Sequence, residues 1–200
     1  MLKMASPAAE RNKDPILSVL RTLMPSHETR VLEIGSGTGQ HAVYFAGQLP
    51  QVLWTTSDLA IRHRDIKAWM DDAKRGNVSG PLEIEIGKHE IPVKAFDIVY
   101  VANVLHIVSW EKVKCLAEML GRSQAVGSQL AIYGPFNYEG KFTSESNQEF
   151  DASLRANDPK SGIRDFEEIS RILGEQGFDL VKDHAMPANN RFLHFKRVRA

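Results

Sequence analysis

Short apolar runs alternate along this chain with segments whose apolar residues recur at helical spacing. Five of the runs have the length and the β-branched or aromatic content of strands. They are residues 30–34, 52–56, 82–86, 96–102 and 129–133. The run 96–102 is nearly all apolar, which is expected for a parallel strand covered on both faces.

Helical periodicity separates these strands, and two further apolar runs close the chain. The expected helices cover 15–24, a segment through 42–46, 61–74, 110–120 and 165–176, and the closing strands cover 178–183 and 192–198. Asp14 and Pro15 read as the cap and first turn of the first helix. The alternation predicts one doubly wound α/β domain over residues 1–200, with helices on both faces of the sheet and right-handed crossovers.

Two segments fall outside the alternation. Residues 1–14 form a polar leader, and 134–164 lose their periodicity apart from a short helix expected at 145–154. The second segment is longer than ordinary connections in α/β domains. We therefore expect 134–164 to act as a lid or substrate loop.

The charge balance narrows the possible partners. The 200 residues carry 25 Lys and Arg against 25 Asp and Glu, so the formal net charge is zero. Such a chain has no global field to hold a phosphate backbone. This argues against a nucleic-acid partner and favours small neutral or zwitterionic ligands.

The amino-acid composition also indicates the cellular compartment and argues against a metal site. The single cysteine, Cys115, allows no internal disulfide, which is typical of a reducing compartment and predicts a cytoplasmic protein. Residues 1–14 have no apolar core of signal-peptide length, and no charge-free stretch is long enough to span a membrane. The histidines lack the spacing of zinc-binding pairs, so no metal site is expected.

A glycine-rich turn follows the first strand and carries the clearest chemical signal. Its sequence is Glu33-Ile-Gly35-Ser-Gly37-Thr-Gly39, and Gln40 stands where a dinucleotide fingerprint would place its last glycine. No Lys-Ser/Thr pair supports a phosphate-binding loop. The spacing instead resembles motif I of class I S-adenosylmethionine-dependent methyltransferases, which implies S-adenosylmethionine as cofactor.

Other residues near predicted strand ends agree with this resemblance. Asp58 ends the second strand, where an acid can accept hydrogen bonds from both ribose hydroxyls, although it could instead cap the following helix. Glu33 is expected to face the positive charge of the cofactor, with a helix-dipole partner as the alternative. The cofactor-binding candidates are Arg11, Glu33, Gly35, Ser36, Gly37, Gly39, Gln40, Asp58, Leu59, Ile86, Gly87 and Asn103.

Longer motifs resemble the methyltransferase-like protein 26 family over almost the whole chain. They include the segments 6–16, 37–41, 133–136, 146–147, 150–151, 153–155, 162–165 and 186–190. The resemblance implies the class I Rossmann-like fold, with a mostly parallel sheet of seven strands whose last is antiparallel. Many class I enzymes place an acid near the end of strand three, whereas this chain reads Glu83-Ile-Glu-Ile-Gly87, so adenine is expected on backbone atoms of Ile86 and Gly87.

The resemblance also suggests residues for the methyl acceptor. Under it, residues 1–14 close as a gate, with Arg11 as a partner for a carboxylate. Candidate bases are His106, Asp151 and Tyr133, in that order. Expected substrate contacts are Asn12, Phe136, Asn147, Arg155, Arg164, Asn189 and Asn190.

The sequence therefore predicts a cytoplasmic methyltransferase that acts on a small polar molecule. Three alternatives stay open: a methyltransferase for protein or RNA, a catalytically inactive regulatory module that binds the cofactor, and a dehydrogenase. Binding of S-adenosylmethionine or of a nicotinamide cofactor separates the last from the others.

Overall fold

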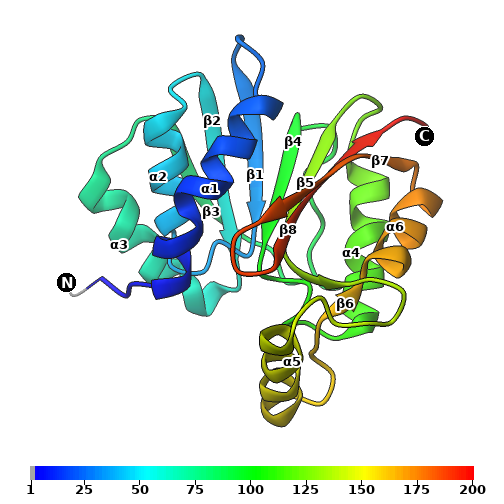
Figure 1. Cartoon of the computed structure of the whole chain (residues 1–200). Coiled ribbons are helices and arrows are strands. Elements are labelled where there is room, and N and C mark those ends of the chain that lie inside the picture. Colours follow the sequence, from blue (N-terminus) through cyan, green and yellow to red (C-terminus); the bar gives the residue numbers. More distant parts are fainter. Residues whose placement is uncertain (1–2) are drawn as a thin grey trace.

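The computed structural model describes residues 3–200 as a twisted sheet with helices on both faces (Figure 1). The strands are β1 (Thr29–Ile34), β2 (Val52–Asp58), β3 (Val78–Glu83), β4 (Ile98–Ala102), β5 (Gln129–Asn137), β6 (Arg164–Asp165), β7 (Phe178–Met186) and β8 (Asn190–Arg197). The helices are α1 (Pro7–Leu23), α2 (Gln40–Gln48), α3 (His63–Ala73), α4 (Trp110–Ser123), α5 (Glu145–Asn157) and α6 (Phe166–Glu175), with a 3-10 turn at Ala60–Arg62.

The strand order is β3-β2-β1-β4-β5-β8-β7, and β6 pairs with β5 outside this path. Strands β1 to β5 run parallel, whereas β8 is antiparallel to both β5 and β7. The expected mostly parallel α/β sheet is confirmed. Because parallel strands end at a common edge, the carboxyl ends of β1, β2, β4 and β5 lie together.

Alternating side chains of the central strands divide the core into two layers. Leu32 and Val99 face the cluster that includes residues of α4 and α6, whereas Val31 and Tyr100 face the one formed with α1 and α2. All four side chains are fully buried. The prediction that the run 96–102 is covered on both faces is thus confirmed for β4.

The third strand lies earlier than the sequence pattern predicts. It covers Val78–Glu83 instead of 82–86, so the Gly80-Pro81 pair stands inside a strand rather than in a turn before it. β3 is an edge strand, and an edge tolerates proline because one side of its backbone needs no ladder partner. Ile84 to Gly87 consequently lie in the loop beyond the strand.

The polar leader is largely helical. Helix α1 begins at Pro7, with the Ser6 side chain accepting a hydrogen bond from Ala9 N–H at 3.3 Å, and Pro15 lies within the helix. The expectation that the helix starts at Pro15 was wrong because a second, earlier cap and proline pair starts it. Met1 and Leu2, which belong to the expected leader, lie outside the described residues.

The segment 134–164 contains more regular structure than expected. β5 continues through Asn137, α5 runs to Asn157, and β6 returns to pair with β5. The predicted helix at 145–154 is confirmed and is longer. Whether this segment moves as a lid stays a prediction. Within residues 3–200, no helix combines the length and apolarity needed to cross a membrane.

The carboxyl end of α4 is held by a buried side chain from the last strand. Arg197 is 7% exposed, and its Nη1 donates to the carbonyls of Leu120, Gly121 and Gln124. The last carbonyls of a helix have no N–H partner within the helix, and Arg197 supplies a donor to carbonyls at this end of α4. A cation at this end also interacts favourably with the helix dipole.

We expect Arg197→Met to lower the free energy of unfolding by about 3 kcal/mol, because it leaves buried carbonyls unpaired. Urea unfolding measures the change. Lys196→Met on the exposed neighbouring position is the control and should stay within about 0.5 kcal/mol of the wild type. Equal effects of the two substitutions would contradict this role for Arg197.

Candidate functional site

The glycine-rich turn after β1 has three glycines with left-handed backbone, at φ values of 74° for Gly35, 60° for Gly37 and 86° for Gly39. A Cβ on Gly35 would lie 2.5 Å from Val104 Cγ2, and one on Gly39 would lie 3.2 Å from the Ile66 backbone. A Cβ on Gly37 would meet no atom within 4 Å. Two of the glycines therefore allow close packing, while Gly37 presents bare backbone to open space.

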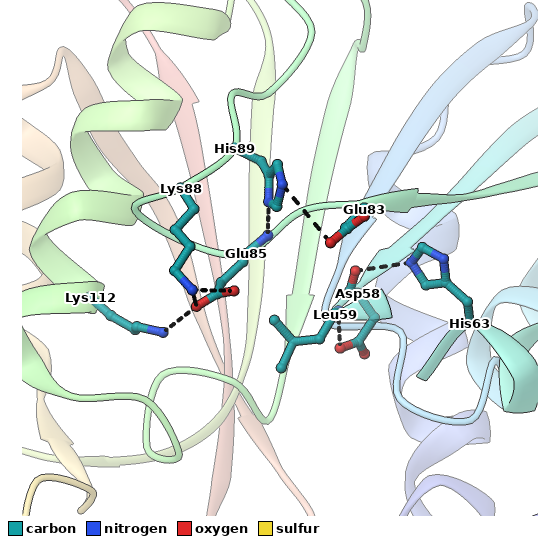
Figure 2. Close-up of polar contacts among 8 residues, drawn as sticks. All are labelled: Asp58, Leu59, His63, Glu83, Glu85, Lys88, His89 and Lys112. Atoms are coloured by element: carbon teal, nitrogen blue, oxygen red, sulfur yellow. Dashed lines mark hydrogen bonds and ion pairs between the residues drawn. The ribbon is translucent and has the colours of Figure 1, made fainter. Parts of the chain in front are cut away.

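The carboxylate of Asp58 is fixed against this turn. Its Oδ2 accepts a hydrogen bond from Gly37 N–H at 2.7 Å, and its Oδ1 accepts one from Leu59 N–H at 2.7 Å. Neither the 3-10 turn nor α3 has a side-chain cap, so the alternative reading of Asp58 as a helix cap was wrong. Figure 2 shows Asp58 beside Leu59, with its backbone carbonyl facing the ring of His63.

Glu33 is buried beneath the turn. Its Oε2 accepts a hydrogen bond from Trp54 Nε1 at 3.1 Å, and it is 2% exposed. Burial raises the pKa of this carboxyl to about 7, against the opposing effects of hydrogen bonds from Trp54 and Ser36. The structure thus gives Glu33 protein partners, and its predicted contact with a cofactor stays a prediction.

The loop beyond β3 carries a compact group of charges (Figure 2). Glu85 accepts from Lys88 Nζ at 2.9 Å and lies 3.5 Å from Lys112 Nζ. The ring nitrogen Nδ1 of His89 accepts a hydrogen bond from Glu85 N–H at 3.0 Å, which closes the loop on itself. Sequence reasoning did not select Glu85, because the strand was placed too late along the chain.

The two residues selected in this loop lie differently. The Ile86 side chain packs in the apolar cluster with α4 and α6, so only its backbone can face a ligand. Gly87 has a φ of 88°, and a Cβ there would lie 3.7 Å from Cys115 Sγ.

The segment that follows β4 places two polar side chains beside Gly134, which lies within β5. Asn103 adopts a φ of 57° and donates its N–H to the Tyr133 carbonyl at 2.8 Å. A Cβ placed on Gly134 would lie 3.5 Å from His106 Nδ1 and 3.9 Å from Asn103 Oδ1. The absence of a side chain at Gly134 therefore leaves room for His106 and Asn103 to converge.

His106 is a buried, neutral ring. It is 5% exposed, its ring lies edge-on to Phe150 with centroids 5.4 Å apart, and its carbonyl accepts from Gly162 N–H at 2.9 Å. Burial, together with the charge of Arg164, lowers the pKa of His106 to about 4. The ring is consequently an uncharged hydrogen-bonding group at neutral pH.

A chain of polar side chains joins β4 to α1 close to Tyr133. Asn12 Oδ1 lies 2.8 Å from His41 Nε2, and Tyr100 Oη lies 3.5 Å from His41 Nδ1. Burial raises the pKa of the Tyr133 phenol, and the Asn12 side chain opposes this rise. Burial lowers the pKa of His41 to about 4, so its ring is neutral. Sequence reasoning missed His41 and Tyr100 as participants, although His41 stands at the end of the quoted 37–41 motif.

Helix α1 also contacts the glycine-rich turn directly. The Gln40 side chain accepts from Ser6 N–H and, at 3.0 Å, from the Thr38 hydroxyl. The motif at 6–16 and the motif at 37–41 are therefore neighbours in space. Arg11 lies on the exposed side of the helix.

The charged residues predicted in the segment 134–164 bind one another and nearby backbone. Asp151 accepts from Arg155 Nε at 2.7 Å and from Ile163 N–H at 2.7 Å. Arg164 donates to the carbonyls of Leu105, Val108 and Lys160. These contacts tie α5 and β6 to the loop that carries His106, a structural role that the sequence did not reveal.

The remaining predicted substrate residues separate into two places. Asn147 Nδ2 donates to the Asn189 carbonyl at 3.2 Å, and the Asn190 side chain bonds within the β7–β8 turn. Phe136 is 2% exposed in the apolar cluster with α4 and α6, so its side chain lies in the core instead of on a pocket wall. Among residues 3–200, no group of His, Cys, Asp or Glu side chains is arranged to hold a metal.

Comparison with known proteins supports the same fold. A family model described as "Protein of unknown function (DUF938)" matches residues 3–197. The methyltransferase SibL aligns over 96% of this chain and 56% of its own, with a TM-score of 0.80 and 20% identity. Mitomycin 7-O-methyltransferase MmcR aligns over 94% and 54%, with a TM-score of 0.79 and 16% identity.

A third structure, an O-methyltransferase family 2 protein from Planctomyces limnophilus in complex with apigenin, has a TM-score of 0.80 and 12% identity. It aligns over 96% of this chain and 60% of its own. This chain thus spans little more than half the length of these proteins. At such identities the likeness establishes the class I methyltransferase fold.

We predict that the stability of the wild type relative to Glu33→Gln falls as pH rises from about 4.5 to about 7. The unfolded carboxyl ionises first, because its ordinary pKa is 4.5 whereas burial raises the folded pKa to about 7. Between these pH values ionisation stabilises the unfolded chain but not the folded one, so the free energy of unfolding falls by on the order of 3 kcal/mol in total. Urea unfolding of both proteins between pH 4 and 8 measures the difference, and a pH-independent difference would contradict the buried, protonated carboxyl.

Proposed function

Since the chain belongs to the family described as "Protein of unknown function (DUF938)", we propose its function from the site itself: an S-adenosylmethionine-dependent methyltransferase that acts on a small polar molecule. The motifs quoted from the sequence further suggest kinship with the methyltransferase-like protein 26 family. The proposal includes a cytoplasmic setting, as the single cysteine indicates.

The observation that carries the proposal is the bare backbone at Gly37 beside a fixed carboxylate. The open space at Gly37 is a cradle that a Cβ would fill, and Asp58 is held there by two backbone N–H groups. A carboxylate at the end of the second strand suits two ribose hydroxyls. The residues present therefore fit the adenosine and amino acid parts of S-adenosylmethionine.

Bound S-adenosylmethionine supplies a methyl group activated by a sulfonium sulfur. We assign the backbone of Gly35, Gly37 and Gly39 to the approach of its amino acid part, and Asp58 to its ribose. Glu33 lies below and offers a negative potential once ionised. Leu59 and the loop backbone at Ile86 and Gly87 are the proposed neighbours of adenine.

The acceptor is proposed to lie where His106 and Asn103 converge at Gly134. Methyl transfer requires alignment of the acceptor atom and exclusion of water more than it requires a covalent group on the protein. A neutral His106 can accept a hydrogen bond from an acceptor hydroxyl and orient its lone pair. Asp151 is engaged by Arg155 and Ile163 N–H, which favours His106 as the group that meets the acceptor.

A small-molecule acceptor agrees with two further observations. The chain has zero formal net charge, which offers no field for a nucleic acid. The structurally similar proteins include one described as a mitomycin 7-O-methyltransferase and one in complex with apigenin. An inactive cofactor-binding module and a nicotinamide-dependent enzyme are outcomes that the following experiments distinguish.

We expect Gly37→Ala to weaken binding of S-adenosylhomocysteine at least 10-fold, because the new methyl group occupies the open space. Isothermal titration calorimetry measures the affinity. Gly127→Ala is the matched control, since Gly127 also has a positive φ, at 96°, and no atom within 4 Å of a Cβ. Both substitutions should cost about 1 kcal/mol of stability through backbone strain.

Only the Gly37 substitution should change the affinity for S-adenosylhomocysteine. Wild-type protein that binds no S-adenosylhomocysteine would refute the proposed cofactor, and binding of NADH in its place would support a dehydrogenase. Binding without transfer of a labelled methyl group to any small molecule would instead support the inactive module.

We predict that His106→Gln lowers kcat about 100-fold while binding of S-adenosylhomocysteine is unchanged. Because burial lowers the pKa of His106 to about 4, the wild-type rate should show no inflection from this group between pH 5 and 8. Methyl-transfer rates across this range measure both effects. His194→Gln, on β8 beside Gln129, is the control and should leave kcat intact.

A further inference from the structure

Ser57, the residue before Asp58 in β2, is bonded to the glycine-rich turn and the strand before it through every one of its polar atoms. Its hydroxyl donates to the Glu33 carbonyl at 2.6 Å, and its N–H donates to Ser36 Oγ at 3.1 Å. Its carbonyl accepts from Gly35 N–H at 3.0 Å and from Ser36 N–H at 2.9 Å. Ser57 is fully buried, so water cannot replace any of these four hydrogen bonds.

One of these bonds comes from the side chain and is therefore specific to serine. Ile34 is the register partner of Ser57 in the parallel pair of β1 and β2, and the hydroxyl adds a bond to Glu33, just before that partner. An alanine would keep the backbone bonds and lose this one. A larger side chain would have to displace packed neighbours, because the position is fully buried.

The opposite edge of β2 gives less support at this point. Two residues of β3, Gly80 and Pro81, lie opposite Thr56 alone. The register of β2 and β3 therefore shifts immediately before Ser57. Such a bulge interrupts the ladder of backbone hydrogen bonds, and Pro81 has no N–H to donate. The glycine-rich turn is consequently the more continuous support for the end of β2.

The position of Ser57 determines the position of the carboxylate that follows it. Asp58 Oδ2 accepts a hydrogen bond from Gly37 N–H at 2.7 Å. The acceptor of this bond lies one residue beyond Ser57 on β2, and the donor lies one residue beyond Ser36 on the turn. The bonds between Ser57 and Ser36 therefore hold both partners in place before a ligand arrives.

We propose that Ser57 is a positioning residue for the cofactor, which orients the Asp58 carboxylate toward the two ribose hydroxyls through its bonds to Glu33 and to the glycine-rich turn. This rests on the proposed function and adds to its site a residue that the sequence did not select. A carboxylate already held in one orientation binds a pair of hydroxyls more tightly, because less rotational freedom is lost on binding.

Amide hydrogen exchange tests this positioning without any ligand. We expect Ser57→Ala to increase the exchange rate of Gly37 N–H about 5-fold in NMR measurements, because the turn opens more readily. The amide of Asp97, which donates to the Arg30 carbonyl at 2.9 Å, is the reference for opening elsewhere in the protein. An unchanged ratio of the Gly37 rate to the Asp97 rate would overturn the proposal.

Ligand affinity tests whether the positioning serves ribose recognition. The probes are S-adenosylhomocysteine and its 2′-deoxyribose analogue, which offers Asp58 one hydroxyl fewer. Wild-type protein should bind the first about 10-fold more tightly in isothermal titration calorimetry. Ser57→Ala should reduce this preference about 3-fold, whereas a merely structural loss would weaken both ligands equally.

Ser128→Ala is the matched control for these affinities. Ser128 Oγ also donates to a backbone carbonyl, that of Ala125, at 2.7 Å, and Ser128 lies just before β5, at the opposite edge of the sheet. This substitution should leave the preference between the two probes unchanged. Should Ser57→Ala fail to fold, Ser36→Ala removes the acceptor of the Ser57 N–H and should show the same loss of preference.

A double-mutant cycle tests whether Ser57 acts through Asp58. In an Asp58→Asn background, Ser57→Ala should change the affinity for S-adenosylhomocysteine less than about 2-fold, because the carboxylate that it orients is gone. Fully independent losses would overturn the proposal, as would equal wild-type affinities for the two probes. If wild-type protein binds neither probe, the proposed function and the ribose role fail together, while amide exchange still decides whether Ser57 holds Gly37 against Asp58.

Discussion

The hydrogen bond from Gly37 N–H to the Asp58 carboxylate, at 2.7 Å, joins the turn after β1 to the end of β2 and fixes the carboxylate at the candidate site. It requires a left-handed backbone at Gly37, which the bare residue adopts without strain. The N–H groups of Gly35 and Ser36 add two bonds to the Ser57 carbonyl, so the whole turn is attached to β2. A ligand in front of Gly37 therefore meets a carboxylate whose orientation is already fixed in the folded protein.

Helix α1 contacts the glycine-rich turn and is bonded to the start of the helix that follows it. Ser6 bonds to Gln40 at the start of α2, and Asn12 bonds to His41, whose ring also lies 3.5 Å from Tyr100 Oη of β4. The polar residues that precede the apolar face of α1 thus connect the glycine-rich turn with the central strand β4. The neutral His41 ring is held between Asn12 of α1 and Tyr100 of β4, with one contact at each ring nitrogen.

Much of the fold and part of the site could be predicted from the sequence because local patterns encode them. Strand periodicity and the glycine spacing located β1, the turn, β4 and the position of Asp58. The errors arose where tertiary context outweighs local signals: Gly80-Pro81 lies in a tolerant edge strand, and the Ser6-Pro7 cap starts α1 earlier than Pro15. Partners distant in sequence, such as Arg164 with Leu105 and Glu85 with Lys112, leave no periodic trace.

Burial explains why the acidic and basic residues of this edge behave differently although the chain carries equal numbers of each. Arg155 and Arg164 satisfy acceptors that folding would otherwise leave unpaired, so they act on the scaffold around His106. Burial raises the pKa of Glu33 to about 7, so this carboxyl is only partly ionised near neutral pH. One carboxylate oxygen of Asp165 accepts no hydrogen bond from any group in residues 3–200. Equal numbers of acids and bases therefore do not mean equal roles at this edge: both guanidinium groups are committed to acceptors within the protein, whereas the charge of Glu33 changes near neutral pH.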